Sequence, residues 1–141
     1  MENDNSNELV LSHVNVIFTE LKDTGFGRSI TIDVTDDDLR AKIEAWVKEN
    51  NINGGKAKIK DYTNEKTGVT TKQYQLRLSD YTDIDGKDGL GEKDLGYGAV
   101  INLCARPFEY DNKFGKGISA SLRGVFIVEP RKNTVMDKIA E

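Results

Sequence analysis

The chain has 141 residues, of which 37% are hydrophobic and 31% are charged, and its formal net charge is −4. This length fits one domain with its own core, and no apolar run approaches the ~20 residues of a membrane-spanning helix. A single cysteine, Cys104, rules out an internal disulfide and fits a reducing compartment. The polar, acidic start MENDNSNE is unlike a signal or transit peptide, so we expect a soluble protein without a membrane partner.

Charges are unevenly distributed along the chain. Residues 56–77 contain six basic and two acidic side chains, and residues 106–132 contain six basic and three acidic ones. Acidic residues concentrate in 1–8, 33–49 and 80–94. This distribution allows a local anion-binding surface on a protein whose net charge is negative.

Two strands are predicted near the N-terminus. Residues 9–18, LVLSHVNVIF, are rich in β-branched residues that partly alternate with polar ones. The lone histidine, His13, lies inside this segment and is interpreted as structural. A turn with two glycines, KDTGFG, leads to a second strand over 28–34, RSITIDV, whose isoleucines share one face.

A helix is predicted after the second strand. Thr35 is the expected N-cap, and the acidic residues 36–38 would occupy the first turn, where the helix dipole favours negative charge. The glycines at 54–55 are expected to end the segment. The apolar residues at helical spacing form one stripe, comprising Leu39, Ile43, Trp46 and Val47. We therefore expect this helix to pack on a sheet with Trp46 in the core.

A β-hairpin is predicted next, from residues 56–62 and 70–79. Lysines alternate with apolar residues in the first of these segments, which gives it a basic face. In the second, Tyr74 shares a face with two leucines, while polar residues occupy the other face. Residues 80–96 are predicted to be a polar loop without periodicity.

Two longer strands, 97–106 and 118–129, flank the stretch FEYDNKFGKG. Pro107 is expected to end the ladder before it, and the asparagine and glycines provide turn chemistry, so the stretch is predicted to be a hairpin tip. Tyr110 is interpreted as its exposed ring, with Phe108 next and Phe114 as the structural one. The residues expected to face inward on the last strand are Ile118, Ala120, Leu122, Phe126 and Val128. Tyr97 is assigned to the core.

About six short strands and one helix predict an all-β fold with one helix, arranged as a small, closed or nearly closed barrel of five to six strands.

The sequence contains no convincing motif for catalysis or for binding a cofactor. Residues 83–92, DIDGKDGLGE, lack acids at the positions that a calcium loop requires in either glycine register. No dinucleotide fingerprint, Walker sequence, cysteine–histidine pair or carboxylate dyad is present. We therefore expect no enzyme activity, no cofactor and no metal.

The remaining pattern interleaves basic and aromatic side chains. Single-stranded nucleic acid requires cations that follow its phosphates and flat rings on which its bases stack. The candidate phosphate contacts are Lys58, Lys60, Lys72, Arg77, Arg106, Lys113, Lys116 and Arg123. The candidate stacking rings are Tyr62, Tyr74, Phe108, Tyr110 and Phe114. Two alternatives stay open: Lys58 and Lys60 could protect an exposed strand edge, and Tyr74 and Phe114 could belong to the core.

Residues 96–129, GYGAVINLCARPFEYDNKFGKGISASLRGVFIVE, resemble the C-terminal part of phage single-stranded DNA-binding proteins with an OB fold. A glycine-led strand, an aromatic turn with Asn and Phe–Gly–x–Gly, and a final strand with regularly spaced Ser, Leu and Val recur in those families. The corresponding segments here are 97–106, 108–117 and 119–128. The rest of the chain agrees only in its order of strand, strand, helix and hairpin.

The resemblance implies a non-catalytic OB-fold protein that coats and protects single-stranded DNA in phage replication or recombination, in the cytoplasm of the bacterial host. RNA is a further candidate ligand, and the implied protein partners are phage replication or recombination proteins and other copies of the chain. The expected division is a flexible acidic N-terminus over 1–8, one OB-fold domain over 9–129 and a C-terminal tail over 130–141. Such proteins often end in an acidic tail; this tail is not strongly acidic, and residues 80–94 are the candidate replacement. The rival hypothesis is a phage protein–protein interaction or structural module on the same barrel.

Overall fold

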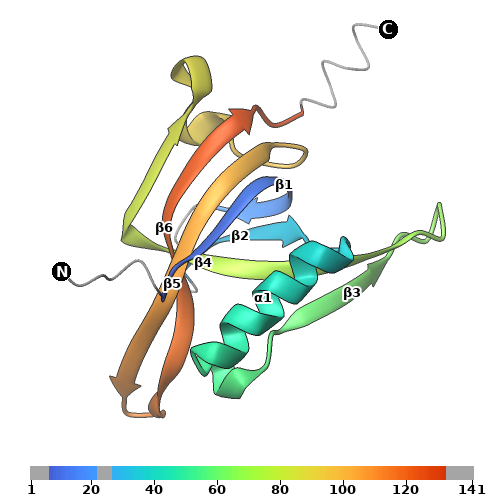
Figure 1. Ribbon diagram of the computed structural model, residues 1–141. Coiled ribbons are helices and arrows are strands. Elements are labelled where there is room, and N and C mark those ends of the chain that lie inside the picture. Colours follow the sequence, from blue (N-terminus) through green and yellow to red (C-terminus); the bar gives the residue numbers. More distant parts are fainter. Residues whose placement is uncertain (1–6, 22–26, 133–141) are drawn as a thin grey trace, which may run out of the picture.

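A computed structural model describes residues 7–21 and 27–132, and within them the chain forms six strands, one α-helix and three short 3₁₀ turns (Figure 1). The strands are β1 (Leu9–Glu20), β2 (Arg28–Asp33), β3 (Ile59–Thr63), β4 (Thr70–Gly86), β5 (Val100–Asn112) and β6 (Gly115–Glu129). The helix is α1 (Asp37–Glu49), and the turns are η2 (Ile52–Gly55), η3 (Lys87–Gly89) and η4 (Glu92–Asp94).

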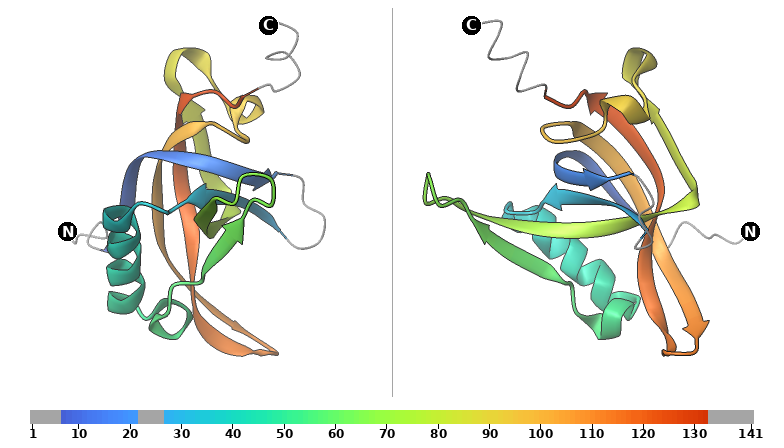
Figure 2. Two further views of the ribbon diagram at one scale, coloured as in Figure 1. Left: turned by 90° about the vertical axis from the view of Figure 1, so that its right-hand side faces the viewer. Right: turned by 180° about the vertical axis from the view of Figure 1, so that it is seen from behind.

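The sheet closes into a barrel. Its strand order is β2-β1-β5-β6-β4-β3, and an additional pairing between β2 and β4 joins the two sides, so that β1, β2, β4, β5 and β6 form a ring. Strand β3 lies outside this ring and pairs only with β4 (Figure 2). The β4–β6 pairing is parallel and the others are antiparallel. This five-stranded closed barrel with one helix is an OB fold, which confirms the fold predicted from the sequence.

Apolar residues at alternating positions on all five strands fill the barrel and form the core. Most of them are β-branched or leucine side chains, and many, such as Ile30, Ile101 and Ile127, have no accessible surface.

The predicted hairpins also form: β3 pairs with β4, and β5 pairs with β6 around a turn at 113–114. Strand β5 continues through Pro107, beyond the predicted end at 106. The proline is accommodated because β1 pairs with β5 only as far as Ala105, so that β5 is an edge strand there.

A β-bulge in β6 reverses the faces of the strand. Cys104 pairs with Gly124 and Ala105 with Leu122, so Arg123 is an extra residue between them. Because successive side chains point to opposite faces, the extra residue turns Val125 inward and leaves Phe126 42% exposed. The expectation that Phe126 and Val128 face the core is therefore wrong beyond the bulge.

Helix α1 begins one residue later than predicted. Asp36, not Thr35, is the N-cap, and its carboxylate accepts a hydrogen bond from the backbone N–H of Leu39 at 2.9 Å. The helix ends at Glu49, before the predicted glycines, which lie in η2 instead. As predicted, Trp46 is buried; its indole N–H also donates to the carbonyl oxygen of Asn7 at 2.7 Å.

The segment predicted as a loop over 80–96 is partly strand. Strand β4 runs on to Gly86, and residues Asp83–Gly86 pair in parallel with Gly124–Ile127 of β6. Exposed Tyr81, Asp83 and Asp85 alternate there with half-buried residues, a period of two that the acidic composition concealed. Residues 87–94 contain the turns η3 and η4.

Parts of both expected terminal segments, residues 1–6 and 133–141, lie outside the described residues, as do 22–26 of the predicted first turn. Near the N-terminus, the Glu8 carboxylate lies 3.9 Å from the guanidinium of Arg106. Near the C-terminus, the backbone N–H groups of Arg131 and Lys132 donate to the carbonyl oxygens of Asp94 and Tyr97. The described part of the chain has no helix long and apolar enough to span a bilayer.

Candidate nucleic-acid interface

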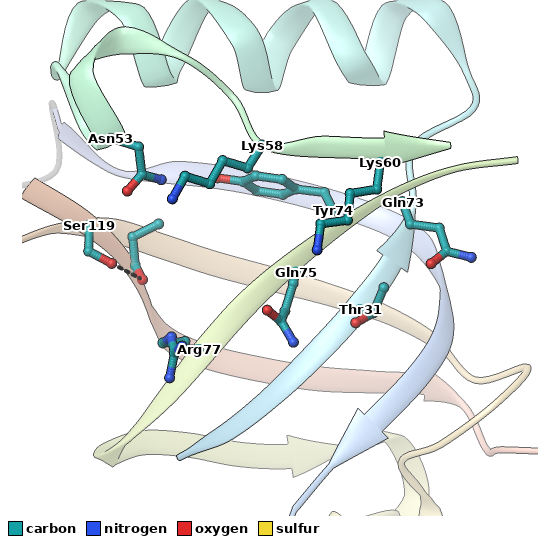
Figure 3. Close-up of a pocket in the computed structure, with 10 residues that line it drawn as sticks. Thr31, Asn53, Lys58, Lys60, Gln73, Tyr74, Gln75, Arg77 and Ser119 are labelled. Atoms are coloured by element: carbon teal, nitrogen blue, oxygen red, sulfur yellow. Dashed lines mark hydrogen bonds between the residues drawn. The ribbon is translucent and has the colours of Figure 1, made fainter. Parts of the chain in front are cut away.

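Two contiguous hollows form a groove across β4 and β6. The first, which we call the hairpin hollow, has a volume of ≈ 720 Å³ and is lined by residues of 77–81, 106–110 and 119–123. The second, the β3 hollow, has a volume of ≈ 440 Å³ and is lined by residues of β2, η2, β4, β6 and the start of β3 (Figure 3). Arg77, Ser119 and Ala120 line both hollows, so the groove runs without interruption from β3 to the β5–β6 hairpin.

The groove is cationic although the protein is acidic. Five basic residues line it, namely Lys58, Lys60, Arg77, Arg106 and Arg123. Among the described residues, no aspartate or glutamate lines either hollow. With a formal net charge of −4 for the whole chain, the positive charge is concentrated where the surface is concave. Such a groove attracts a polyanion, because the cations that line it have no acidic neighbours in the lining to repel the ligand.

The floor between the cations consists of small residues. Ser119, Ala120 and Ser121 lie on β6, where all three pair with β5 and Ser121 also pairs with β4. Small side chains keep the floor low, so that a flat ligand can approach the sheet. Arg106 and Arg123 line the hairpin hollow beside this floor. Lys58 and Lys60 line the β3 hollow (Figure 3).

Three exposed aromatic rings line the hairpin hollow. Tyr81 is 89% exposed, Phe108 56% and Tyr110 40%. Tyr110 lies across Gly117 on the neighbouring strand: a Cβ atom added at this glycine would be 2.7 Å from the tyrosine hydroxyl. The glycine therefore positions the Tyr110 ring. As interpreted from the sequence, Tyr110 and Phe108 are both exposed, although Phe108 is the more exposed of the two.

Tyr81 is a groove residue that the sequence analysis missed. It lies at a bend of β4, where the register with β6 shifts between Leu78 and Asp83. Side-chain hydroxyls hold the bend: the Thr82 hydroxyl donates to the Leu122 carbonyl at 2.6 Å, and the Tyr81 N–H donates to the Ser79 hydroxyl at 3.1 Å. The alternation of residues 81–85 was the signal that could have revealed this strand.

Of the candidate residues predicted from the sequence, Lys58, Lys60, Tyr74, Arg77, Arg106, Phe108, Tyr110 and Arg123 line the groove. Tyr74 is nevertheless a core residue, because only 3% of it is exposed, and burial raises its pKa to about 12. Its edge reaches the β3 hollow, but its ring has no free face for a base. The alternative reading, that Tyr74 belongs to the core, is the one the structure supports.

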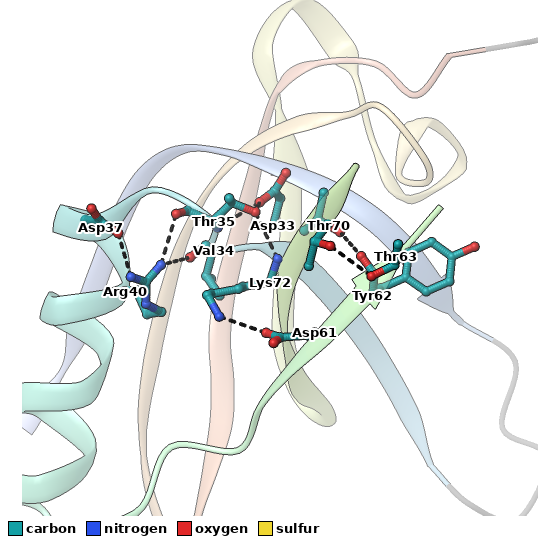
Figure 4. A network of polar contacts seen from close by, with 11 residues as sticks. Asp33, Val34, Thr35, Asp37, Arg40, Asp61, Tyr62, Thr63, Thr70 and Lys72 are labelled. Atoms are coloured by element: carbon teal, nitrogen blue, oxygen red, sulfur yellow. Dashed lines mark hydrogen bonds and ion pairs between the residues drawn. The ribbon is translucent and has the colours of Figure 1, made fainter. Parts of the chain in front are cut away.

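The other five candidates lie outside both hollows. Tyr62 is 55% exposed on β3, and the Lys72 ammonium forms an ion pair with Asp61 at 2.8 Å (Figure 4). The remaining three, Lys113, Phe114 and Lys116, are at the tip of the β5–β6 hairpin. Phe114 is 87% exposed, so the expectation that it is the structural ring is wrong: the hairpin carries its turn away from the barrel (Figure 1).

Among the described residues, no histidine, cysteine, aspartate or glutamate lines the groove. No group of histidine, cysteine, aspartate and glutamate in that part of the chain could hold a metal ion. Burial, together with the neighbouring Glu8 carboxylate, raises the pKa of the Cys104 thiol, which disfavours the thiolate. Tyr97, assigned to the core from the sequence, is 59% exposed and lies outside the groove.

The fold is similar to that of solved phage proteins. No family model and no curated protein matches the chain. The single-stranded DNA-binding protein from bacteriophage Enc34 superposes with a TM-score of 0.64 at 20% identity, covering 94% of this chain and 89% of that one. Its C-terminal truncation and its complex with single-stranded DNA give TM-scores of 0.62 and 0.61 at 20% identity, each covering 94% of both chains. At this identity the likeness confirms the OB fold implied by the resemblance.

Proposed function

We propose that this protein binds single-stranded DNA through the groove, largely independently of sequence and without catalysis. The observation that carries the proposal is the continuous groove with five cations and no described acidic residue, next to three exposed rings, on a protein of net charge −4. The shared fold supports it, because one of the similar structures is a complex with single-stranded DNA. Coating and protecting single strands in phage replication or recombination, in the host cytoplasm, is the role that fits this binding.

In this proposal, phosphates contact the cations and bases stack on the rings. Lys58 and Lys60 meet the backbone at one end of the groove, and Arg106 and Arg123 at the other. Base faces lie on Tyr81, Phe108 and Tyr110, which is possible only where the bases are unpaired. Every base has a flat face and every nucleotide a phosphate, so neither contact selects a sequence. The domain that carries this activity corresponds to residues 9–129.

Titration of the protein with oligo(dT) tests the proposal, with intrinsic fluorescence as the readout. If all five cations contact phosphates, the log–log slope of affinity against salt should reach about −3.5, from −0.7 for each contact. Matched single-stranded RNA and duplex DNA complete the comparison, and duplex should bind more weakly because its bases are stacked. Absence of binding to oligo(dT) at low salt would refute the proposal and favour a protein–protein interaction module on the same barrel.

A further inference from the structure

The tip of the β5–β6 hairpin carries a second, separate constellation. The Phe114 ring is 87% exposed, and the ammonium of Lys113 lies 5.2 Å from its centroid. Lys116 is exposed on the other side of the turn. We call Lys113, Phe114 and Lys116 the tip. It lies outside the groove, at the end of a hairpin that extends well beyond the barrel (Figures 1 and 2).

A shallow hollow of ≈ 320 Å³ with the opposite character lies on the outer face of β1, β4, β5 and β6. Its lining is mainly apolar, with Val10 53% exposed and Phe126 turned outward by the bulge in β6. Asp83 and Asp85 stand beside these residues on β4. Within the described part of the chain, neither carboxylate forms an ion pair. We call this surface the acidic hollow.

The tip and the acidic hollow carry opposite charges, and each has an exposed apolar surface. The tip presents the exposed Phe114 ring with the Lys113 ammonium 5.2 Å from its centroid, and the hollow presents an apolar depression beside two carboxylates. They cannot meet within one molecule. Cys104 of the hollow and Asn112 next to the tip are eight residues apart on the same strand, which separates them by about 26 Å. The occupant that fits the hollow is therefore the tip of a second copy.

We propose that neighbouring copies on one DNA strand associate head to tail, with the tip of each copy in the acidic hollow of the next. This inference rests on the proposed function. The two surfaces differ, so the contact is heterologous and can propagate into an open chain of copies. One ring and two lysines bury far less than the ~1,200 Å² of a stable interface. The contact therefore forms when DNA holds two copies close together, at an effective concentration of about millimolar.

Cross-linking tests the geometry directly, because the only cysteine, Cys104, lines the acidic hollow. An Asp111→Cys variant, which keeps the three residues of the tip and places a thiol at an exposed position beside them, should give a ladder of covalent multimers on long poly(dT) with a short bis-maleimide. On an oligonucleotide that holds one copy, it should stay monomeric. The matched control is Val69→Cys, which places a thiol at the turn of the other hairpin, where Val69 is 56% exposed. No ladder with Asp111→Cys, or an equal ladder with Val69→Cys, would overturn the inference.

Charge reversal separates this inference from the proposed function. Lys113→Glu with Lys116→Glu, or Asp83→Lys with Asp85→Lys, should each lower the cooperativity of binding to long poly(dT) by about tenfold. A chain that carries both reversals should recover the cooperativity of the unaltered protein. The affinity of each variant for a one-copy oligonucleotide should be unchanged, since neither set of residues lines the groove. Unchanged cooperativity would overturn the head-to-tail contact alone, whereas absence of binding by the unaltered protein to the short oligonucleotide would refute the proposed function.

Discussion

Replacing Tyr81 by alanine tests the stacking role of the groove with little risk to the fold. The side chain is 89% exposed at the bend of β4, so its removal takes almost nothing from the core. The hydrogen bond at this residue, to the Ser79 hydroxyl, comes from the backbone N–H and stays in place. The free energy of unfolding should therefore change by no more than about 0.5 kcal/mol.

The loss of affinity should be much larger. Stacking of a base on an aromatic ring contributes roughly 1–3 kcal/mol, and 1.4 kcal/mol corresponds to a tenfold change in affinity, so Tyr81→Ala should bind oligo(dT) about 5- to 150-fold more weakly. Because stacking is not an ionic contact, the slope of affinity against salt should be unchanged. Tyr81→Phe, which keeps the ring and removes only the hydroxyl, should bind like the unaltered protein.

Tyr97→Ala is the matched control, since this tyrosine is also exposed, at 59%, but lies outside both hollows. Fluorescence titrations give the affinities, and thermal unfolding shows whether each variant is folded. The reasoning is refuted if Tyr81→Ala retains full affinity, or if Tyr97→Ala loses as much affinity as Tyr81→Ala does.

Three further predictions follow from the structure. Lys58→Ala combined with Lys60→Ala should make the salt slope shallower by about 1.4; an unchanged slope in oligo(dT) titrations would assign these lysines to protection of the β3 edge. Thr82→Val removes the hydroxyl that donates to the Leu122 carbonyl at 2.6 Å, which should cost about 1–3 kcal/mol of stability; a melting temperature equal to that of the unaltered protein would contradict this. Burial raises the pKa of Tyr74 from 10.0 to about 12, so its contribution to stability is complete below pH 10 and is lost as the pH rises through 12, by roughly 2.7 kcal/mol in total. Urea unfolding over this range should show a shallower decline for Tyr74→Phe than for the unaltered protein, and parallel curves would count against the burial argument.

Local patterns in the sequence determined which segments form strands and helix. The stripe that contains Ile43 and Trp46 has the period of a helix, and both residues are buried in α1. The stretch FEYDNKFGKG has the turn chemistry of a hairpin tip, and it connects the two paired strands β5 and β6. These signals are readable because they depend on neighbours within a few residues. They also placed several cations and rings close enough in sequence to indicate an anion-binding surface.

The faces of the strands were decided by pairing between distant segments. The bulge at Arg123 exists only because β6 pairs with β5, yet it reverses every side chain after it and exposes Phe126. The parallel pairing with β6 likewise turned an acidic stretch into the end of β4 and brought Tyr81 to the groove. The β4–β6 pairing joins residues about 40 positions apart and the pairing at the bulge joins Cys104 to Gly124, 20 positions apart, so no local period encodes either one.

The sequence by itself therefore determined the kinds of residue that this protein offers to a ligand: cations, rings and small residues on strands. Only the tertiary structure decided which of them share a surface. The pairing of β4 with β6 brings the β3–β4 and β5–β6 hairpins together, so that Lys58 and Arg106 share one groove. The fold also buries the ring of Tyr74 and leaves Phe114 exposed at the hairpin tip. The physical reason is that alternation fixes a side chain's face only relative to its own strand, while the partner strand and its register fix what that face meets.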